Sequence, residues 1–162
     1  MEFQPIIEEE KIAKEVILLI LPKGITGFID NMEEMIDGQQ FKKICYEVLR
    51  GAKGEVIKFE GPLYPHNYFK VHIRLKGELF YILLNEYYPY LAFANKWEDI
   101  VIEFTDLPTL TTGFGEYYTV LTKKELDLPF FKKEHDLEEV ELRQAAYWRP
   151  RSIGEVIFNC WD

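Results

Sequence analysis

The chain has 162 residues, with 19 Lys and Arg against 28 Asp and Glu, for a net charge of −9. This length is typical of one domain, so we expect residues 1–162 to form a single domain. The acidic excess argues against general binding to duplex DNA, because such proteins normally present basic side chains to the phosphates. The longest apolar run, residues 16–21, is far shorter than the roughly 20 residues of a membrane span.

The start of the chain and the cysteines both favour the cytoplasm. Residues 1–4 lack the basic start and apolar stretch of a secretion signal. Cys45 and Cys160 stand alone, and a reducing compartment disfavours a disulfide between them. We therefore predict a cytoplasmic protein with two buried thiols.

Helical patterns dominate the first third of the chain. Residues 5–21 begin with Pro5 and repeat apolar side chains at helical spacing, although residues 16–21 also fit a buried strand. A second helical pattern runs from a capping pair, Asp30 and Glu33, through Met32, Met35 and Ile36 to the apolar positions of residues 41–49, with Gly51 after its end.

The rest of the chain reads as a sheet followed by a short helix. Residues 68–76 alternate between apolar and basic side chains, and Gly77 marks a turn other than the two-residue Asn-Gly type. Residues 105–135 read as irregular apart from a short helix at 123–126, and alternation in 137–148 predicts a last strand. The other expected strands are 55–59, 79–84, 90–94 and 100–104.

Ser152 and Glu155 match a capping box before a short C-terminal helix. The predicted fold class is α+β: N-terminal helices, an antiparallel meander sheet of about five or six strands, and a short C-terminal helix.

No motif predicts a catalytic, cofactor or metal site. The single serine, Ser152, lies in a helix cap rather than in a nucleophile elbow. His66 and His72 are six residues apart, which is roughly 20 Å along a strand and too far for one metal ion. We predict no catalytic residue, no cofactor and no metal ligand, and lean towards a protein that is not an enzyme.

Lys70, His72, Arg74 and Lys76 form a basic stripe on one strand face. The stripe fits an RNA surface with Tyr68 or Tyr81 for stacking, or the wet face of a sheet whose charges are paired with acids from neighbouring strands. The net charge favours the second interpretation.

Turn aromatics and acidic side chains form the candidate partner-binding set. Tyrosine and tryptophan are frequent both in binding surfaces and in cores, so either role fits the aromatics. Exposed acids steer a basic partner towards a surface, or simply keep the protein soluble. The candidate residues are Tyr87, Tyr88, Tyr90, Trp97, Glu98, Asp99, Glu134, Asp136, Glu138, Glu139 and Glu141.

The C-terminal string over residues 147–162 resembles the Tyr-Trp-x-Pro-x-x-x-Gly-(Glu/Asp)-x-x-Phe-Asn-x-Trp-Asp ending of small bacterial proteins grouped as immunity proteins of toxin systems. The resemblance covers about the last tenth of the chain and implies a cytoplasmic protein that neutralises a toxin by binding, without catalysis. The matching residues are Tyr147, Trp148, Pro150, Gly154, Glu155, Phe158, Asn159, Trp161 and Asp162.

The leading functional hypothesis is a non-enzymatic intracellular binding protein, an immunity or antitoxin-like inhibitor that occludes a basic partner protein. The alternatives are a small-ligand module or cryptic enzyme with an aromatic-lined cleft, and an RNA-associated protein that uses the basic strand face. The sequence leaves the oligomeric state open.

Overall fold

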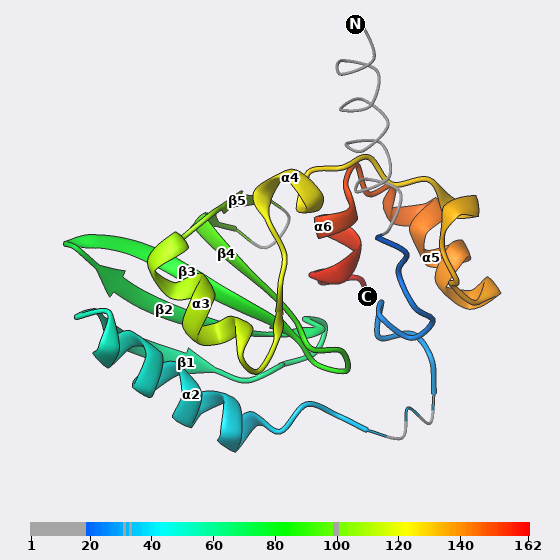
Figure 1. The fold of residues 1–162 in the computed structure, drawn as a ribbon. Coiled ribbons are helices and arrows are strands. Elements are labelled where there is room, and N and C mark those ends of the chain that lie inside the picture. Colours follow the sequence, from blue (N-terminus) through cyan, green and yellow to red (C-terminus); the bar gives the residue numbers. More distant parts are fainter. Residues whose placement is uncertain (1–18, 31, 33, 99–100) are drawn as a thin grey trace, which may run out of the picture.

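The computed structural model describes residues 19–30, 32, 34–98 and 101–162 (Figure 1). Within them, one sheet has the strand order β1-β2-β3-β4-β5, every neighbouring pair is antiparallel, and β6 pairs with β4 in parallel. The strands are β1 Glu55–Glu60, β2 Tyr68–Leu75, β3 Glu78–Asn85, β4 Tyr90–Trp97, β5 Ile102–Thr105 and β6 Thr119–Val120. The predicted α+β meander is therefore confirmed.

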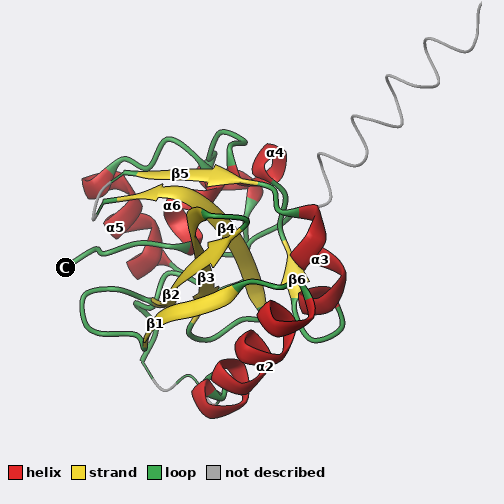
Figure 2. Cartoon of the chain, turned by 90° about the vertical axis from the view of Figure 1, so that its left-hand side faces the viewer, coloured by secondary structure: helices red, strands yellow, loops and turns green. Residues whose placement is uncertain are grey.

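Helices cover both faces of the sheet, with α2 and α3 on one side and α5 and α6 on the other (Figures 1 and 2). The helices α2, α3 and α6 bury apolar residues, which is the usual reason for such a layered arrangement, whereas α5 buries Glu141 and Ala145. The helices are α2 Gly38–Gly51, α3 Pro108–Gly115, α4 Lys123–Leu126, α5 Glu139–Trp148 and α6 Ile153–Ile157, with a 3₁₀ turn, η1, at Lys132–Glu134.

The first face of the sheet carries a purely apolar core. The alternation in β2 places Phe69, Val71, Ile73 and Leu75 on this face, where all four are buried. Phe41 of α2 packs edge-on against Phe69, with 5.4 Å between the ring centroids. The core on this side joins α2, α3 and the three central strands.

The second face is only half covered. The short helix α6 and the C-terminal segment bury Tyr68, Leu83 and Ala92 at one end of the strands. At the other end of the same face, Arg74 and Leu79 are exposed. This uncovered half contains the predicted basic stripe.

The helix predicted for residues 5–21 lies almost entirely outside the described residues, and residues 19–21 are not helical. The second helix starts later than predicted, because Asp37 is its N-cap: its carboxylate accepts from the amides of Gln39 and Gln40. Met32 and residues 34–36 lie before the helix without regular secondary structure, and Glu33 is outside the described residues.

The end of α2 differs from prediction, whereas the turn predicted at Gly77 is present between β2 and β3. The helix continues through Gly51, and Lys53, with φ 59°, takes the left-handed position expected for a glycine. Leu75 pairs with Glu78, so the hairpin is a two-residue turn in which Lys76 and Gly77 both have positive φ.

Residues 137–148 were predicted to be a strand, and this is wrong: the segment forms α5. The period of two was coincidental, because the buried residues are Glu141 and Ala145, four positions apart on one helical face. Residues 105–135 are also more regular than predicted. Pro108 starts α3, and Leu110 and Phe114 bury its inner face.

Candidate functional site

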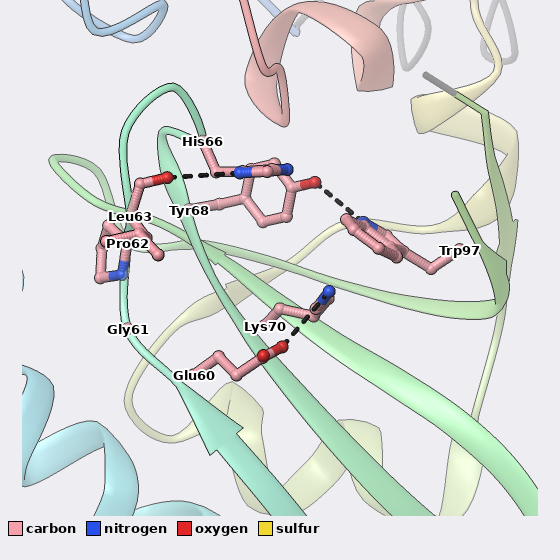
Figure 3. A pocket seen from close by; sticks show the side chains of 8 residues that line it. All are labelled: Glu60, Gly61, Pro62, Leu63, His66, Tyr68, Lys70 and Trp97. Carbon is pink, nitrogen blue, oxygen red and sulfur yellow. Dashed lines mark hydrogen bonds and ion pairs between the residues drawn. The ribbon is translucent and has the colours of Figure 1, made fainter. Parts of the chain in front are cut away.

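A pocket of about 360 Å³ lies where the covered and uncovered halves of the second face meet (Figure 3). Tyr68 and Lys70 come from β2, Glu60 ends β1, and Trp97 ends β4. The loop between β1 and β2 supplies Leu63 and His66. We call this cavity the Trp97 pocket.

The charges of the Trp97 pocket neutralise one another. Lys70 Nζ lies 3.1 Å from the centroid of the Trp97 ring and 3.3 Å from Glu60 Oε2. Lys58 Nζ and His72 Nε2 also contact the Glu60 carboxylate, at 3.1 and 3.0 Å. The indole N–H of Trp97 donates to the Tyr68 hydroxyl at 2.8 Å.

These contacts set the ionisation of Glu60. Partial burial by itself would raise the pKa of this carboxyl, but hydrogen bonds from His72, Lys58 and Lys70, together with the charge on Lys70, lower the pKa to about 2. Arg74 pairs with Glu55 on the neighbouring strand in the same way. Three members of the basic stripe are therefore paired with acids of β1, as expected for the wet face of a sheet.

The turn tyrosines lie elsewhere, at the hairpin between β3 and β4. Tyr87, Tyr88 and Tyr90 are half-buried, and the rings of Tyr88 and Tyr90 are stacked with 6.2 Å between their centroids. The hydroxyl of Tyr88 donates to the carbonyl of Lys23. Burial is the main cause that raises the pKa of Tyr88, followed by the charge on Glu141 and by Tyr90. Tyr88 therefore contacts the loop that precedes α2, and Tyr90 stacks on Tyr88.

Of the two predicted acids near Trp97, Glu98 is exposed and lines a hollow of about 310 Å³ together with Tyr81 and Trp97. Asp99 is outside the described residues. The described members of the predicted partner-binding set therefore do not form one surface: Trp97 and Glu98 lie together, and the remaining acids lie on or just before α5.

An apolar groove of about 530 Å³ lies beside the segment that joins α4 to α5. Two apolar side chains that line it are strongly exposed, Ile20 by 50% and Phe131 by 54%. Glu134 lines the same groove, and Asp136, Glu138 and Glu139 are exposed directly after it in the chain. We call the groove together with these four acids the acidic groove. Its other apolar lining residues are Leu19, Leu128, Pro129 and Ile153.

His135 is a polar side chain in the lining of the acidic groove. Its Nδ1 accepts from the amide of Leu21 at 3.0 Å, and its ring stacks on Phe130 with 5.3 Å between centroids. Desolvation is the main cause that lowers the pKa of His135, although the charges of Glu134 and Asp136 act in the opposite direction. Within the described chain, Nε2 of His135 is a buried polar atom without a hydrogen-bond partner.

Glu141 was predicted to belong to the partner-binding acids, and the structure corrects this. Its side chain is completely buried. Its carboxylate accepts from the amide of Gly24 at 2.9 Å, the amide and hydroxyl of Thr26, and the amide of Glu138 at 3.0 Å. Glu141 therefore fastens residues 24–26 to the start of α5 and is not available to a partner.

The C-terminal string is largely structural. The side-chain amide of Asn159 donates to the carbonyls of Thr26 and Val156, and its oxygen accepts from the amide of Trp161. The hydroxyl of Ser152 accepts from the amide of Glu155, which confirms Ser152 as the cap of α6. The predicted capping box is only half formed, because the Glu155 carboxylate accepts from the amide of Arg151 and not from that of Ser152. Tyr147 stands out from the string because its side chain is 77% exposed.

Sequence reasoning did not identify His135, Ile20 or Phe131 as site residues. The only signal was the apolar stretch at 128–131, which two lysines separate from the acidic run that starts at Glu134. The groove itself depends on residues 19–21, which join the segment through the contact between Leu21 and His135, 114 positions apart in the chain.

Among the described residues, no three histidine, cysteine or acidic side chains are grouped so as to hold a metal ion. None of the helices in the described ranges combines the length and the apolar character needed to cross a bilayer. Cys45 is a buried free thiol whose pKa is raised by burial, and Cys160 is half-buried.

Comparisons with protein-family models, curated proteins and solved structures found nothing that matches this chain. The resemblance of the C-terminal string to immunity proteins therefore stays a prediction.

Proposed function

We propose that this protein is a non-enzymatic, intracellular protein-binding module that inhibits a basic partner by occluding its surface, in the manner of an immunity protein. The acidic groove is the proposed contact. The observation that carries the proposal is that an apolar groove lies beside a segment with four acidic side chains, three of which are exposed directly after the groove in the chain.

This combination matches the usual anatomy of a protein interface. Apolar anchors in a central depression supply most of the binding energy, and a charged rim gives specificity and faster association. The net charge of −9 adds a long-range attraction for a basic protein. In the acidic groove, Ile20 and Phe131 would contact the anchor, and Glu134 and Glu139 would face Lys and Arg of the partner.

The proposal is tested with the protein encoded beside this one, in a pull-down, a surface-binding assay and a growth-protection assay. The double variant Glu134→Lys and Glu139→Lys should slow association by about tenfold or more, with a weaker dependence on salt. Glu47→Lys with Glu116→Lys is the matched control, because both acids are exposed and the change in net charge is the same. Failure to bind or protect, or equal losses in both double variants, would contradict the proposal.

A second candidate function is the binding of a small aromatic or apolar ligand in the Trp97 pocket. Its support is the aromatic lining of Trp97, Tyr68 and His66 and a volume within the range of ligand sites. A fragment screen read by tryptophan fluorescence tests it, with Trp97→Phe as the reporter control. A ligand whose signal persists in Trp97→Phe binds elsewhere and speaks against this candidate.

A further inference from the structure

The outer face of α2 and the turn after it carry four exposed cations that form no ion pair within the described residues. They are Lys42, Lys43, Arg50 and Lys53. The basic stripe of β2 differs in this respect, because Lys70 and Arg74 each contact an acid of β1. The four cations are therefore available to an anionic partner.

Tyr46 lies at the centre of these cations and is 44% exposed. Residues three and four positions apart are neighbours on a helix surface. Lys42 and Lys43 therefore flank this tyrosine on one side, and Arg50 flanks it on the other. We call Tyr46 and the four cations the basic α2 face. Tyrosine and arginine are enriched at the centres of protein interfaces, where polar side chains surround them, and the basic α2 face matches this composition.

Fewer acids surround the basic α2 face. Glu47 is on the helix itself, about 140° around its axis from Lys42. Glu55 of β1 is paired with Arg74. The other exposed acids of the adjoining described segments are Glu34 and Asp37 before the helix and Glu116 at the end of α3. Asp37 is about 14 Å of helix away from Tyr46, farther than the screening length of about 8 Å at physiological salt. Four cations against Glu47 and Glu116 leave the region around Tyr46 positive.

The shape of this face selects among anionic partners. A single-stranded nucleic acid needs several exposed rings along a cationic groove, whereas α2 is a convex helix surface with one exposed ring. A helix that binds an anionic membrane inserts its apolar side, but the apolar side of α2 is buried in the core. An acidic protein segment needs neither a groove nor an insertion.

We propose that the basic α2 face binds an acidic segment of a partner protein, whose carboxylates pair with Lys43 and Arg50 and whose apolar side chains pack on Tyr46. This surface goes beyond the proposed function, because α2 covers the first face of the sheet and the acidic groove lies beside the segment between α4 and α5 (Figure 1). Charges farther apart than the screening length act almost independently, so a chain with a net charge of −9 can still bind an acidic segment at this face.

The probe is the peptide Gly-Gly-Asp-Glu-Leu-Phe-Glu-Asp-amide, labelled with rhodamine at its N-terminus and added to the full chain. Fluorescence anisotropy measures its binding at low and at physiological ionic strength. We expect saturable binding at low salt that weakens by about fivefold or more at physiological salt. The matched peptide, with Asn and Gln in place of Asp and Glu, should bind about tenfold more weakly or worse.

Lys43→Glu with Arg50→Glu should weaken binding of the acidic peptide by about tenfold or more, because it reverses two charges beside Tyr46. Lys124→Glu with Arg143→Glu is the matched control. Both of its cations are exposed and form no ion pair within the described residues, and the change in net charge is the same. The affinity of this control should stay within about twofold. Lys43→Gln with Arg50→Gln takes the place of the first variant if charge reversal impairs folding.

Tyr46→Ala tests the apolar part of the contact and should weaken binding by about three- to tenfold. Tyr147→Ala removes another exposed tyrosine from a helix and should leave the affinity unchanged.

The proposal is supported if the acidic peptide binds and loses affinity in the α2 variants but not in their controls. Absence of binding at low salt, or equal losses in both double variants, overturns it. Tighter binding of a single-stranded thymidine oligonucleotide or of phosphatidylserine vesicles, with the same dependence on Lys43 and Arg50, also overturns it, because the occupant would then be a nucleic acid or a membrane. The pull-down that tests the acidic groove is independent of these results.

Discussion

The segments that cover the two faces of the sheet are held there by different kinds of interaction. On the first face, Phe41 of α2 packs against Phe69 of β2, and Phe114 of α3 packs against Phe93 of β4. The core there contains only apolar residues. On the second face, the apolar core around α6 is joined by buried polar side chains: Thr26, Asn67, Asn85, Glu141 and Asn159.

The polar side chains of the second face connect segments that no regular backbone pairing joins. Asn67 and Asn85 both donate to the carbonyls of Ile25 and Ile157, which links β2 and β3 to the loop before α2 and to α6. Apolar packing is proportional to area and has little direction, whereas hydrogen bonds fix positions. The first face should therefore tolerate changes of shape, and the second should not tolerate changes of polarity.

The sharpest contrast is expected from two nearly isosteric substitutions. Asn159→Asp replaces a donor that faces two carbonyls with a buried charge, and should lower the free energy of unfolding by about 3–5 kcal/mol. Leu84→Met on the first face keeps volume and polarity, and should cost less than about 1.5 kcal/mol. Urea unfolding measures both, and equal losses would mean that the two faces do not differ as described.

The next largest loss in the free energy of unfolding is expected from a substitution of Glu141. Glu141→Gln turns one acceptor oxygen into a donor that must face the amides of Gly24 or Thr26, so we expect a loss on the order of 3 kcal/mol in the free energy of unfolding. Glu139→Gln, which is exposed on the same helix, should change it by no more than about 0.5 kcal/mol. A similar small loss for both variants would show that the buried carboxylate does not hold the loop.

Gly154 tests how closely α6 must approach the sheet. A Cβ at this position would lie 3.0 Å from the carbonyl oxygen of Leu126 and closer still to the ring of Phe104. Gly154→Ala should therefore lower the free energy of unfolding by about 1–3 kcal/mol. Gly115→Ala, where a Cβ meets nothing within 4 Å, should raise it by up to about 1 kcal/mol. Thermal unfolding compares the two, and a neutral Gly154→Ala would mean that α6 can move away.

The smallest expected loss of stability comes from Glu60, on the uncovered half of the second face. The pKa of Glu60 is about 2, below its ordinary 4.5, so its contribution to stability is present above pH 4.5 and is lost as the pH falls towards 2. The side chain is 32% exposed, which limits this contribution to about 1 kcal/mol. Denaturant unfolding of Glu60→Gln should give a deficit that shrinks over this pH range. A deficit independent of pH would point to lost packing instead.

The sequence pattern predicted much of the sheet and little of the candidate site. The alternation in β2 follows from the period-two geometry of a strand, and the Ser152 cap follows from local hydrogen bonding, so both could be read without the fold. In residues 137–148, by contrast, alternation and helical spacing competed. Tertiary contacts of Glu141 and Ala145 favour the helix.

The sequence alone therefore determined the meander, the two faces of β2, the Ser152 cap of α6 and the acidic balance of the chain. Tertiary structure alone decided which acids are exposed and where the apolar groove lies. The carboxylates of Glu139 and Glu141 are two residues apart, yet one is exposed and the other is completely buried. The physical reason is that burial depends on partners distant in sequence, which no local pattern encodes. For Glu141 these partners are residues 24–26, and for His135 the partner is Leu21.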